Sequence, residues 1–229
     1  MEMILHNDPI HYVYDNNKSD TLVVMLHGLT MDSYMYPFND LAKDIYNLGF
    51  DVLRFDFIGH GKSYGESKDM TIKKEIDDAV DMINHFKSGY KQLIIMGHSQ
   101  GGLIAGNLAN IFNSSKLILL CPGYNLKDCA INRVFFGKKI KDDKPVHIWN
   151  MTFSKEYLKD IALDCYYDIS YEGPITIIHG DKDILVPIEY SLRLKERYPN
   201  IDLKIIRDSD HEFIGFYEEL WEFVKKSLL

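Results

Sequence analysis

Short, nearly continuous apolar runs alternate along the chain with segments of helical periodicity. The runs are rich in β-branched residues and are bounded by Gly, Asp or Pro; they cover residues 21–28, 51–57, 92–97, 116–121, 174–180 and 202–208. Runs that are continuous rather than alternating are typical of strands buried on both faces, as in a parallel sheet. The pattern therefore predicts these segments as central strands.

Helical spacing recurs between the runs. Residues 72–86 carry an apolar stripe that predicts an amphipathic helix, whose other face holds Lys73, Lys74, Asp77, Asp78 and Asp81. A second stripe, from Phe213 to Val224, predicts a helix near the carboxyl end. The alternation of strands and helices favours an α/β fold with a mostly parallel sheet and helices on both faces. The opening ILHNDPIHYVYD predicts an antiparallel hairpin at the sheet edge.

One interval interrupts the alternation. Residues 123–171 lie between two predicted strands and are longer than a normal connection. Within them VHIWNMTF is strand-like and SKEYLKDIALDCYY is helix-like. We interpret residues 1–229 as a single domain with a small cap inserted at about 123–171. Insertions after the strands of an open α/β sheet lie where ligands bind.

Composition and charge narrow the classes of function. The chain has 46% hydrophobic and 26% charged residues, as expected of a soluble globular domain. A net charge of -8 without a Lys/Arg-rich run argues against nucleic-acid binding and favours a small-molecule partner. The amino-terminal residues lack a secretory signal pattern, and no apolar run reaches membrane-spanning length, so we expect a cytoplasmic protein without a membrane span.

The cysteines indicate no special chemistry. Cys121, Cys129 and Cys165 are odd in number and follow neither a CxxC nor a Cys/His ligand spacing. We therefore predict neither a disulfide framework nor a structural zinc site.

Ser99 is the candidate nucleophile. It is the central residue of Gly97-His98-Ser99-Gln100-Gly101, which matches G-x-S-x-G, follows the apolar run 93–96 and precedes a helical pattern. This context predicts a tight strand-to-helix turn that exposes the serine, and glycines allow the close backbone approach such a turn requires.

A serine needs a base and an acid that orients the base. In this fold class the acid comes next in the chain and the histidine last, each in a loop after a strand. HGDKDILVP supplies Asp181 and Asp183, and DSDHEF supplies His211. We predict His211 as the base, with Asp183 competing with Asp181 for the role of the acid. Three further histidines, His60, His98 and His179, are predicted to be structural, and two further aspartates, Asp208 and Asp210, to shape their loop.

Acyl transfer also requires backbone N–H donors for the developing oxyanion. One donor is expected from the residue after the nucleophile, Gln100, at the start of a helix. The second is expected from the loop after an earlier strand, MLHGLT, in which Leu29 is the candidate.

The segments HGLT, FDFIGHGKSYG, GHSQGG and the pair HGDKDILVP with SDHEF together resemble the α/β-hydrolase superfamily over essentially the whole chain. In that superfamily the acid usually ends a G-x-x-D pattern, which falls on Asp183 and favours it over Asp181. The region RFDFIGHGKSYGESKDMTIKKEIDDA is similar to small bacterial cinnamoyl and feruloyl esterases and to their serine-aminopeptidase-like and monoglyceride-lipase-like relatives.

The resemblance implies hydrolysis of a small-molecule carboxylic ester through Ser99, His211 and Asp183, without a metal or other cofactor. It also makes Asp142 or Asp143, in the stretch KDDKPVHIW, candidates for contacting the substrate's phenolic end. Trp149 is a further candidate for substrate contact, together with Phe135, Phe136 and Phe153, which alternatively form the core of the cap. The same groups serve thioesterase, monoacylglycerol lipase, peptidase or acyltransferase chemistry, and a non-catalytic ligand-binding hydrolase fold is a further alternative.

Overall fold

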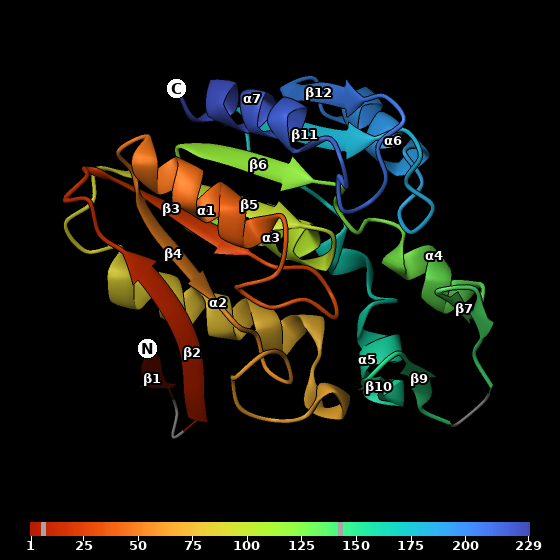
Figure 1. Cartoon of the computed structure of the whole chain (residues 1–229). Helices are drawn as coiled ribbons and strands as arrows, with labels where there is room; N and C mark the ends of the chain where they lie inside the picture. Colours follow the sequence, from red (N-terminus) through yellow and green to blue (C-terminus); the bar gives the residue numbers. More distant parts are fainter. Residues whose placement is uncertain (6–7, 142–143) are drawn as a thin grey trace.

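The strands form one central sheet in the computed structural model, which describes residues 1–5, 8–141 and 144–229. Within these residues the sheet has eight strands in the order β1-β2-β4-β3-β5-β6-β11-β12 (Figure 1). They are β1 (Glu2–Leu5), β2 (Asp8–Asp15), β3 (Thr21–Leu26), β4 (Asp51–Phe55), β5 (Gln92–His98), β6 (Lys116–Leu120), β11 (Ile175–Gly180) and β12 (Ile201–Ile206). The strands from β4 to β12 in this order pair in parallel, whereas β1 and β2 form the predicted antiparallel edge hairpin. The predicted central strands are confirmed.

Helices cover both faces of the sheet, as predicted (Figure 1). The main helices are α1 (Phe38–Asn47), α2 (Ile72–Phe86), α3 (Gln100–Ile111), α6 (Glu189–Arg197) and α7 (Tyr217–Leu228). Apolar residues of α2 and α3 belong to one buried cluster, and those of α1 and α7 belong to a second cluster. The sheet therefore separates two layers of core. Among the described helices, none combines the length and the apolar character needed to cross a membrane.

Two helix predictions need correction. Asp78, predicted on the solvent face of α2, is buried and accepts hydrogen bonds from Tyr64 Oη at 2.9 Å and from Ile58 N at 3.2 Å. Burial raises its pKa to about 6. The last helix begins at Tyr217 rather than at Phe213, because Phe213 has a left-handed φ of 59° in the turn before it. The Phe213 side chain nevertheless packs in the second core cluster.

The described part of the predicted insertion, residues 123–141 and 144–171, lies beyond the carboxyl ends of the central strands (Figure 1). Its described elements are α4 (Leu126–Ile131), β7 (Val134–Phe135), β8 (Lys138–Lys139), β9 (Val146–Ile148), β10 (Met151–Phe153), α5 (Lys155–Asp160) and the 3-10 turn η2 (Asp164–Tyr166). VHIWNMTF forms the β9–β10 hairpin, and SKEYLKDIALDCYY forms α5 and η2. Several hydrogen bonds fasten this half of the insertion to the rest of the chain. Among them, Lys73 N donates to Asp160 Oδ2 at 3.1 Å, and Thr152 N donates to Ser67 Oγ, in the 3-10 turn η1 (Ser67–Asp69), at 2.9 Å.

Candidate active site

Ser99 occupies a strained turn between β5 and α3. Its φ of 53° and ψ of -122° lie in a region that non-glycine residues seldom adopt. The turn is tight because a Cβ at Gly97 would lie 2.1 Å from the Gly101 carbonyl oxygen, and one at Gly101 would lie 2.2 Å from that of Leu26. The glycines of the G-x-S-x-G motif are therefore sterically required, and the backbone presents Ser99 at the carboxyl end of β5.

His211 and Asp183, which come from different loops, are joined by a short hydrogen bond. His211 Nδ1 lies 2.6 Å from Asp183 Oδ2, while Asp183 Oδ1 accepts from the backbone N–H groups of Leu185 and Val186, both at 2.8 Å. Burial alone would raise the pKa of Asp183, but hydrogen bonds from His179 and His211 outweigh burial and hold this pKa well below its usual range. The charged carboxylate favours the proton on Nδ1 and leaves Nε2 of the neutral ring as an acceptor.

The other aspartates near this pair have different partners. Asp181 Oδ1 accepts from Asp208 N at 2.7 Å. Asp210 Oδ1 accepts from the backbone N–H groups of Glu212 at 3.2 Å and Ile214 at 3.0 Å, as predicted for a residue that shapes its loop. The structure thus brings Asp183, rather than Asp181, to the imidazole of His211.

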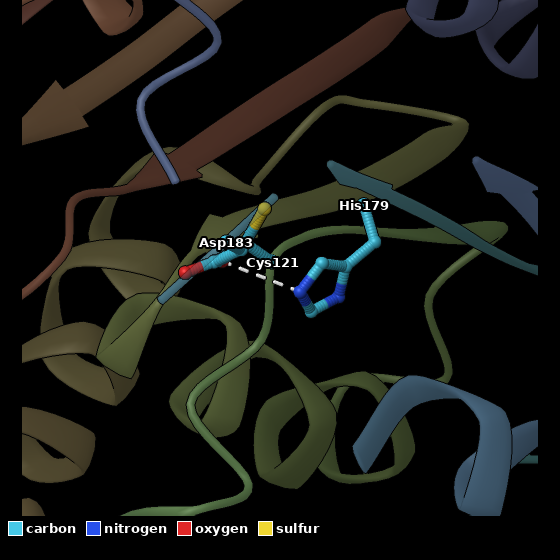
Figure 2. A group of neighbouring side chains, drawn as sticks. All are labelled: Cys121, His179 and Asp183. Carbon is cyan, nitrogen blue, oxygen red and sulfur yellow. Dashed lines mark ion pairs between the residues drawn. The ribbon is translucent and has the colours of Figure 1, made fainter. Parts of the chain in front are cut away.

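Another buried histidine, His179, lies beside the Asp183 carboxylate. Its Nε2 lies 3.3 Å from Asp183 Oδ2 (Figure 2) and donates to the Val186 carbonyl oxygen at 2.9 Å. Its Nδ1 accepts from Ser191 Oγ at 2.7 Å. Cys121 completes a buried group of side chains whose donor atoms lie within 4.8 Å of one another. The group does not suit a cation, because both His179 nitrogens and both Asp183 oxygens already form hydrogen bonds. Burial also raises the pKa of the Cys121 thiol and keeps it protonated.

His98 holds the backbone of His211. Its Nε2 donates to the His211 carbonyl oxygen at 2.9 Å, and the two rings lie 4.7 Å apart between centroids. Burial lowers the pKa of His98 to about 3, so the ring is neutral. His98 and His179 therefore both pack against the predicted triad, consistent with their expected structural roles.

Two further histidines fix the loop that carries Leu29. His27 Nδ1 donates to the Gly28 carbonyl oxygen at 2.8 Å, and His60 Nε2 accepts from Thr30 N at 3.3 Å. Burial lowers the pKa of His27 and lowers that of His60 to about 3, so both rings are neutral. Leu29 and Gln100 line the same cavity as Ser99. Their N–H groups remain the predicted oxyanion donors.

Sequence reasoning missed two residues behind Gln100. The Gln100 side chain donates through Nε2 to Glu75 Oε2 at 2.6 Å and accepts through Oε1 from Tyr157 Oη at 2.6 Å. Glu75 is fully buried, and burial raises its pKa well above the usual carboxyl value. The sequence does indicate the burial of Glu75, because position 75 lies at helical spacing from Ile72 and Ala79 and therefore on the apolar stripe of α2.

The protonation of Glu75 predicts a pH-dependent effect of Glu75→Gln on stability. The folded protein keeps a proton that the unfolded chain releases above a pKa of about 4.5, so Glu75 lowers the free energy of unfolding as pH rises from there towards its raised pKa. We expect the free energy of unfolding of Glu75→Gln, relative to the unmodified protein, to be larger at pH 8 than at pH 5, with a slope of at most about 1.4 kcal/mol per pH unit below the raised pKa of Glu75. Chemical denaturation of both proteins at pH 5 and at pH 8 measures this difference in the free energy of unfolding.

Glu218→Gln is the matched control, because Glu218 also lies in the first turn of a helix but is exposed. The control should show no comparable pH dependence. A stability difference for Glu75→Gln that is the same at pH 5 and pH 8 would mean that Glu75 is charged in the folded protein.

A cavity of about 510 Å³ opens beside Ser99. One wall carries Ser99, Leu29 and Gln100, and the remaining lining comes from the insertion and from the segment after Asp183. The apolar lining residues include Leu126, Val134, Phe135, Phe136, Ile184, Leu185, Val186 and Pro187, and the polar ones include Asn125, Asp128, Asn132 and Tyr190. Asp128 Oδ2 accepts from Tyr190 Oη at 2.6 Å, which places a hydrogen-bonded polar pair in a mainly apolar site.

The predicted substrate contacts of the insertion are placed as follows. Asp142 and Asp143 lie outside the described residues. Trp149 is 67% exposed at the turn between β9 and β10, and its ring packs 5.3 Å from that of Phe136, which lines the cavity. Phe135 is fully buried yet also lines the cavity, whereas Phe153 is fully buried in the aromatic core of the insertion. A contact of Trp149 with substrate stays a prediction.

Comparison with known proteins identifies the family. The family model described as serine aminopeptidase, S33, matches residues 17–143, more than half of the chain. The chain belongs to the serine aminopeptidase S33 family of hydrolases. This S33-family protein is 28% identical over 198 residues to the human mitochondrial palmitoyl-protein thioesterase ABHD10, covering 78% of this chain and 63% of that one. It therefore spans about 63% of the length of these relatives. It is 35% identical over 243 residues to the proline iminopeptidase PfmaB of Pestalotiopsis fici, covering 83% and 85% of the two chains.

Solved structures show the same fold as this S33-family chain. Est1E from Butyrivibrio proteoclasticus with bound ferulic acid superposes with a TM-score of 0.92 at 24% identity, covering 100% of this chain and 97% of that one. Mouse ABHD10 superposes with a TM-score of 0.83 at 17% identity, covering 100% and 97%. The α/β-hydrolase fold predicted from the sequence is confirmed.

Proposed function

We propose that the protein is a serine carboxylic-ester hydrolase that works through an acyl-enzyme. The observation that carries this proposal is the short bond between His211 Nδ1 and Asp183 Oδ2, in a site where Ser99 lies on a strained turn at the wall of an apolar cavity. A nucleophile, a base and an acid that orients the base are the groups acyl transfer requires.

In the proposed reaction, Ser99 Oγ forms a bond to the ester carbonyl carbon while its proton passes to His211 Nε2. The carbonyl electron pair moves onto oxygen, and the N–H groups of Leu29 and Gln100 bind this oxyanion. Collapse of the intermediate breaks the ester C–O bond, and the alcohol leaves with the proton from His211. Water then attacks the acyl-enzyme in the same way and releases the carboxylic acid.

The proposed substrates are hydroxycinnamoyl esters or esters of other small acyl groups, with the insertion acting as a cap over the acyl part. The cavity volume of about 510 Å³ suits a small organic ligand, and Asp128 with Tyr190 offers a polar partner for a hydroxyl group within the apolar lining. The structural similarity to Est1E, which binds ferulic acid, supports the aromatic choice. A thioesterase is the second candidate, favoured by the similarity to relatives named palmitoyl-protein thioesterases.

A substrate panel tests this proposal. The panel contains p-nitrophenyl esters of increasing chain length, methyl ferulate, a monoacylglycerol, an acyl thioester and an aminoacyl amide. We expect the highest kcat/KM for methyl ferulate or a short acyl ester, because the cavity is mainly apolar with one polar pair.

Preferential thioester cleavage would favour the second candidate, and cleavage of the amide alone would contradict the esterase proposal. Labelling of the folded protein by a fluorophosphonate probe distinguishes an enzyme from a non-catalytic binding protein. The cytoplasmic location stays a prediction, to be checked by fractionation, since the thioesterase relatives are named as mitochondrial.

A further inference from the structure

We propose that Tyr157 and Glu75 are positioning residues for the oxyanion hole, and that through Tyr157 the insertion fixes the backbone N–H of Gln100. The inference rests on the proposed function, because it assigns a role to side chains behind one of the proposed oxyanion donors. Neither residue lines the cavity described beside Ser99, so neither is expected to touch the reacting atoms.

The geometry clamps Gln100 from both sides. Its side chain is held at Nε2 by Glu75 and at Oε1 by Tyr157, each at 2.6 Å. Gln100 is the first residue of α3, directly after the strained Ser99, and it is buried. Fixing this side chain restricts the backbone torsions of the same residue, and these torsions set the direction of its N–H group. An oxyanion donor is effective when its direction is fixed before the charge develops.

The donors and acceptors of Tyr157, Gln100 and Glu75 match one another when Glu75 is protonated. Tyr157 donates its hydroxyl proton to the amide oxygen of Gln100, so the amide nitrogen must donate to Glu75 Oε2. The buried Glu75 is kept neutral, as its raised pKa indicates, which avoids an unpaired charge in the core. An amide at position 100 is required because it both accepts and donates within this group of three side chains.

The same tyrosine packs behind the wall of the substrate cavity, against a residue that lines it. The Tyr157 ring lies 6.0 Å from the Phe135 ring and 5.5 Å from the Phe153 ring, and Phe135 lines the cavity. Helix α5, which carries Tyr157, is fastened to α2 by the hydrogen bond from Lys73 N to Asp160 Oδ2. The insertion therefore shapes the acyl pocket and the oxyanion hole through one aromatic cluster.

Tyr157→Phe tests the role of the insertion. The substitution removes one hydroxyl and keeps the ring, so packing against Phe135 and Phe153 is preserved. We expect kcat for the best ester of the panel to fall about 10-fold, less than the 10²–10³ loss from removing an oxyanion donor outright, with KM nearly unchanged. Binding of a trifluoromethyl ketone, which forms a tetrahedral oxyanion on the nucleophile, should weaken by the same factor.

Tyr167→Phe is the matched control. Tyr167 also lies in the insertion and donates its hydroxyl to a buried partner, the Ile161 carbonyl oxygen at 2.7 Å, but among the described residues no hydrogen bond joins it to Gln100. The control should change neither kcat nor trifluoromethyl ketone binding. Equal kcat and equal ketone affinity in Tyr157→Phe and Tyr167→Phe would overturn the proposal, and so would a loss in Tyr157→Phe confined to thermal stability.

A second pair of variants tests the other side of the clamp and does not depend on Tyr157. Glu75→Gln keeps an oxygen that accepts from Gln100 Nε2, so kcat should stay within about twofold of the unmodified value, whereas Glu75→Leu should lose about 10-fold. Equal kcat in these two variants would contradict a positioning role for Glu75.

Failure of this inference can be told apart from failure of the proposed function. If the unmodified protein hydrolyses the ester and Ser99 reacts with the fluorophosphonate probe while Tyr157→Phe behaves like its control, only the positioning role is wrong. If the unmodified protein neither reacts with the fluorophosphonate probe nor hydrolyses any substrate of the panel, both the proposed function and the positioning role are wrong.

Discussion

Ser99→Ala is expected to reduce ester hydrolysis by about 10⁶-fold, the effect of removing the nucleophile from a comparable triad. The proposed reaction begins with a bond from Ser99 Oγ, and alanine has no atom that can replace it. The turn itself should persist, because it is held by Gly97, Gly101 and the hydrogen bond from Ser99 N to the Leu120 carbonyl oxygen at 2.9 Å. Steady-state hydrolysis of a p-nitrophenyl ester measures the loss of activity, and the melting temperature shows whether the fold persists.

Ser115→Ala provides the control for this substitution. Ser115 directly precedes the amino end of β6, whereas Ser99 follows the carboxyl end of β5, so the control places the same chemical change at the opposite edge of the sheet. Its turnover should be unaltered. Near-normal hydrolysis by Ser99→Ala in a folded sample would exclude the acyl-enzyme mechanism.

Asp183→Asn should reduce kcat by about 10⁴-fold. Asp183 Oδ1 accepts two backbone N–H groups, so the amide oxygen of asparagine must take that position and its NH₂ group must replace Oδ2. The NH₂ group would then face two donors, His211 Nδ1 at 2.6 Å and His179 Nε2 at 3.3 Å. His211 would have to carry its proton on Nε2, where it could no longer accept the proton of Ser99.

Asp181→Asn is the comparison that tests the choice of carboxylate. Asp181 Oδ1 accepts from Asp208 N, and an amide oxygen can accept the same bond, so we expect kcat within about threefold of the unmodified protein. A severe loss in Asp181→Asn together with a mild one in Asp183→Asn would show that the proposed acid is the wrong one. Circular dichroism of both variants confirms that they are folded.

The central sheet was predictable from the sequence because its parallel strands are buried on both faces. Such strands need apolar residues at every position, as in Leu22 to Leu26 or Leu117 to Leu120, and continuous runs of this kind are easily recognised. The segments that carry Ser99, Asp183 and His211 were predictable for a related reason. Each residue lies in the turn or loop after one of these runs, and the carboxyl ends of parallel strands meet at one edge of the sheet.

The insertion and the polar core behind it were less predictable. Strands β7 and β8 have only two residues each, too few to show a period, and their pairing depends on the turn between them. Glu75, Gln100 and Tyr157 are each unremarkable in sequence, since their partnership joins α2, α3 and α5 across 25 and 57 residues of chain. Asp78 was misplaced for the same reason, because its partners Ile58 and Tyr64 belong to a distant loop.

The clamp on Gln100 has a consequence for which substitutions can occur one at a time. Glu75 is fully buried beside the polar side chains of Gln100 and His60, and its Oε1 has no hydrogen-bond partner among the described residues. Leucine at position 75 alone would leave the buried Gln100 Nε2 without its acceptor, and a buried donor that loses its partner lowers the free energy of unfolding. An apolar residue at position 75 becomes compatible with a stable core only when the amide at position 100 is replaced as well. Positions 75 and 100 are therefore expected to change together in stable variants rather than separately.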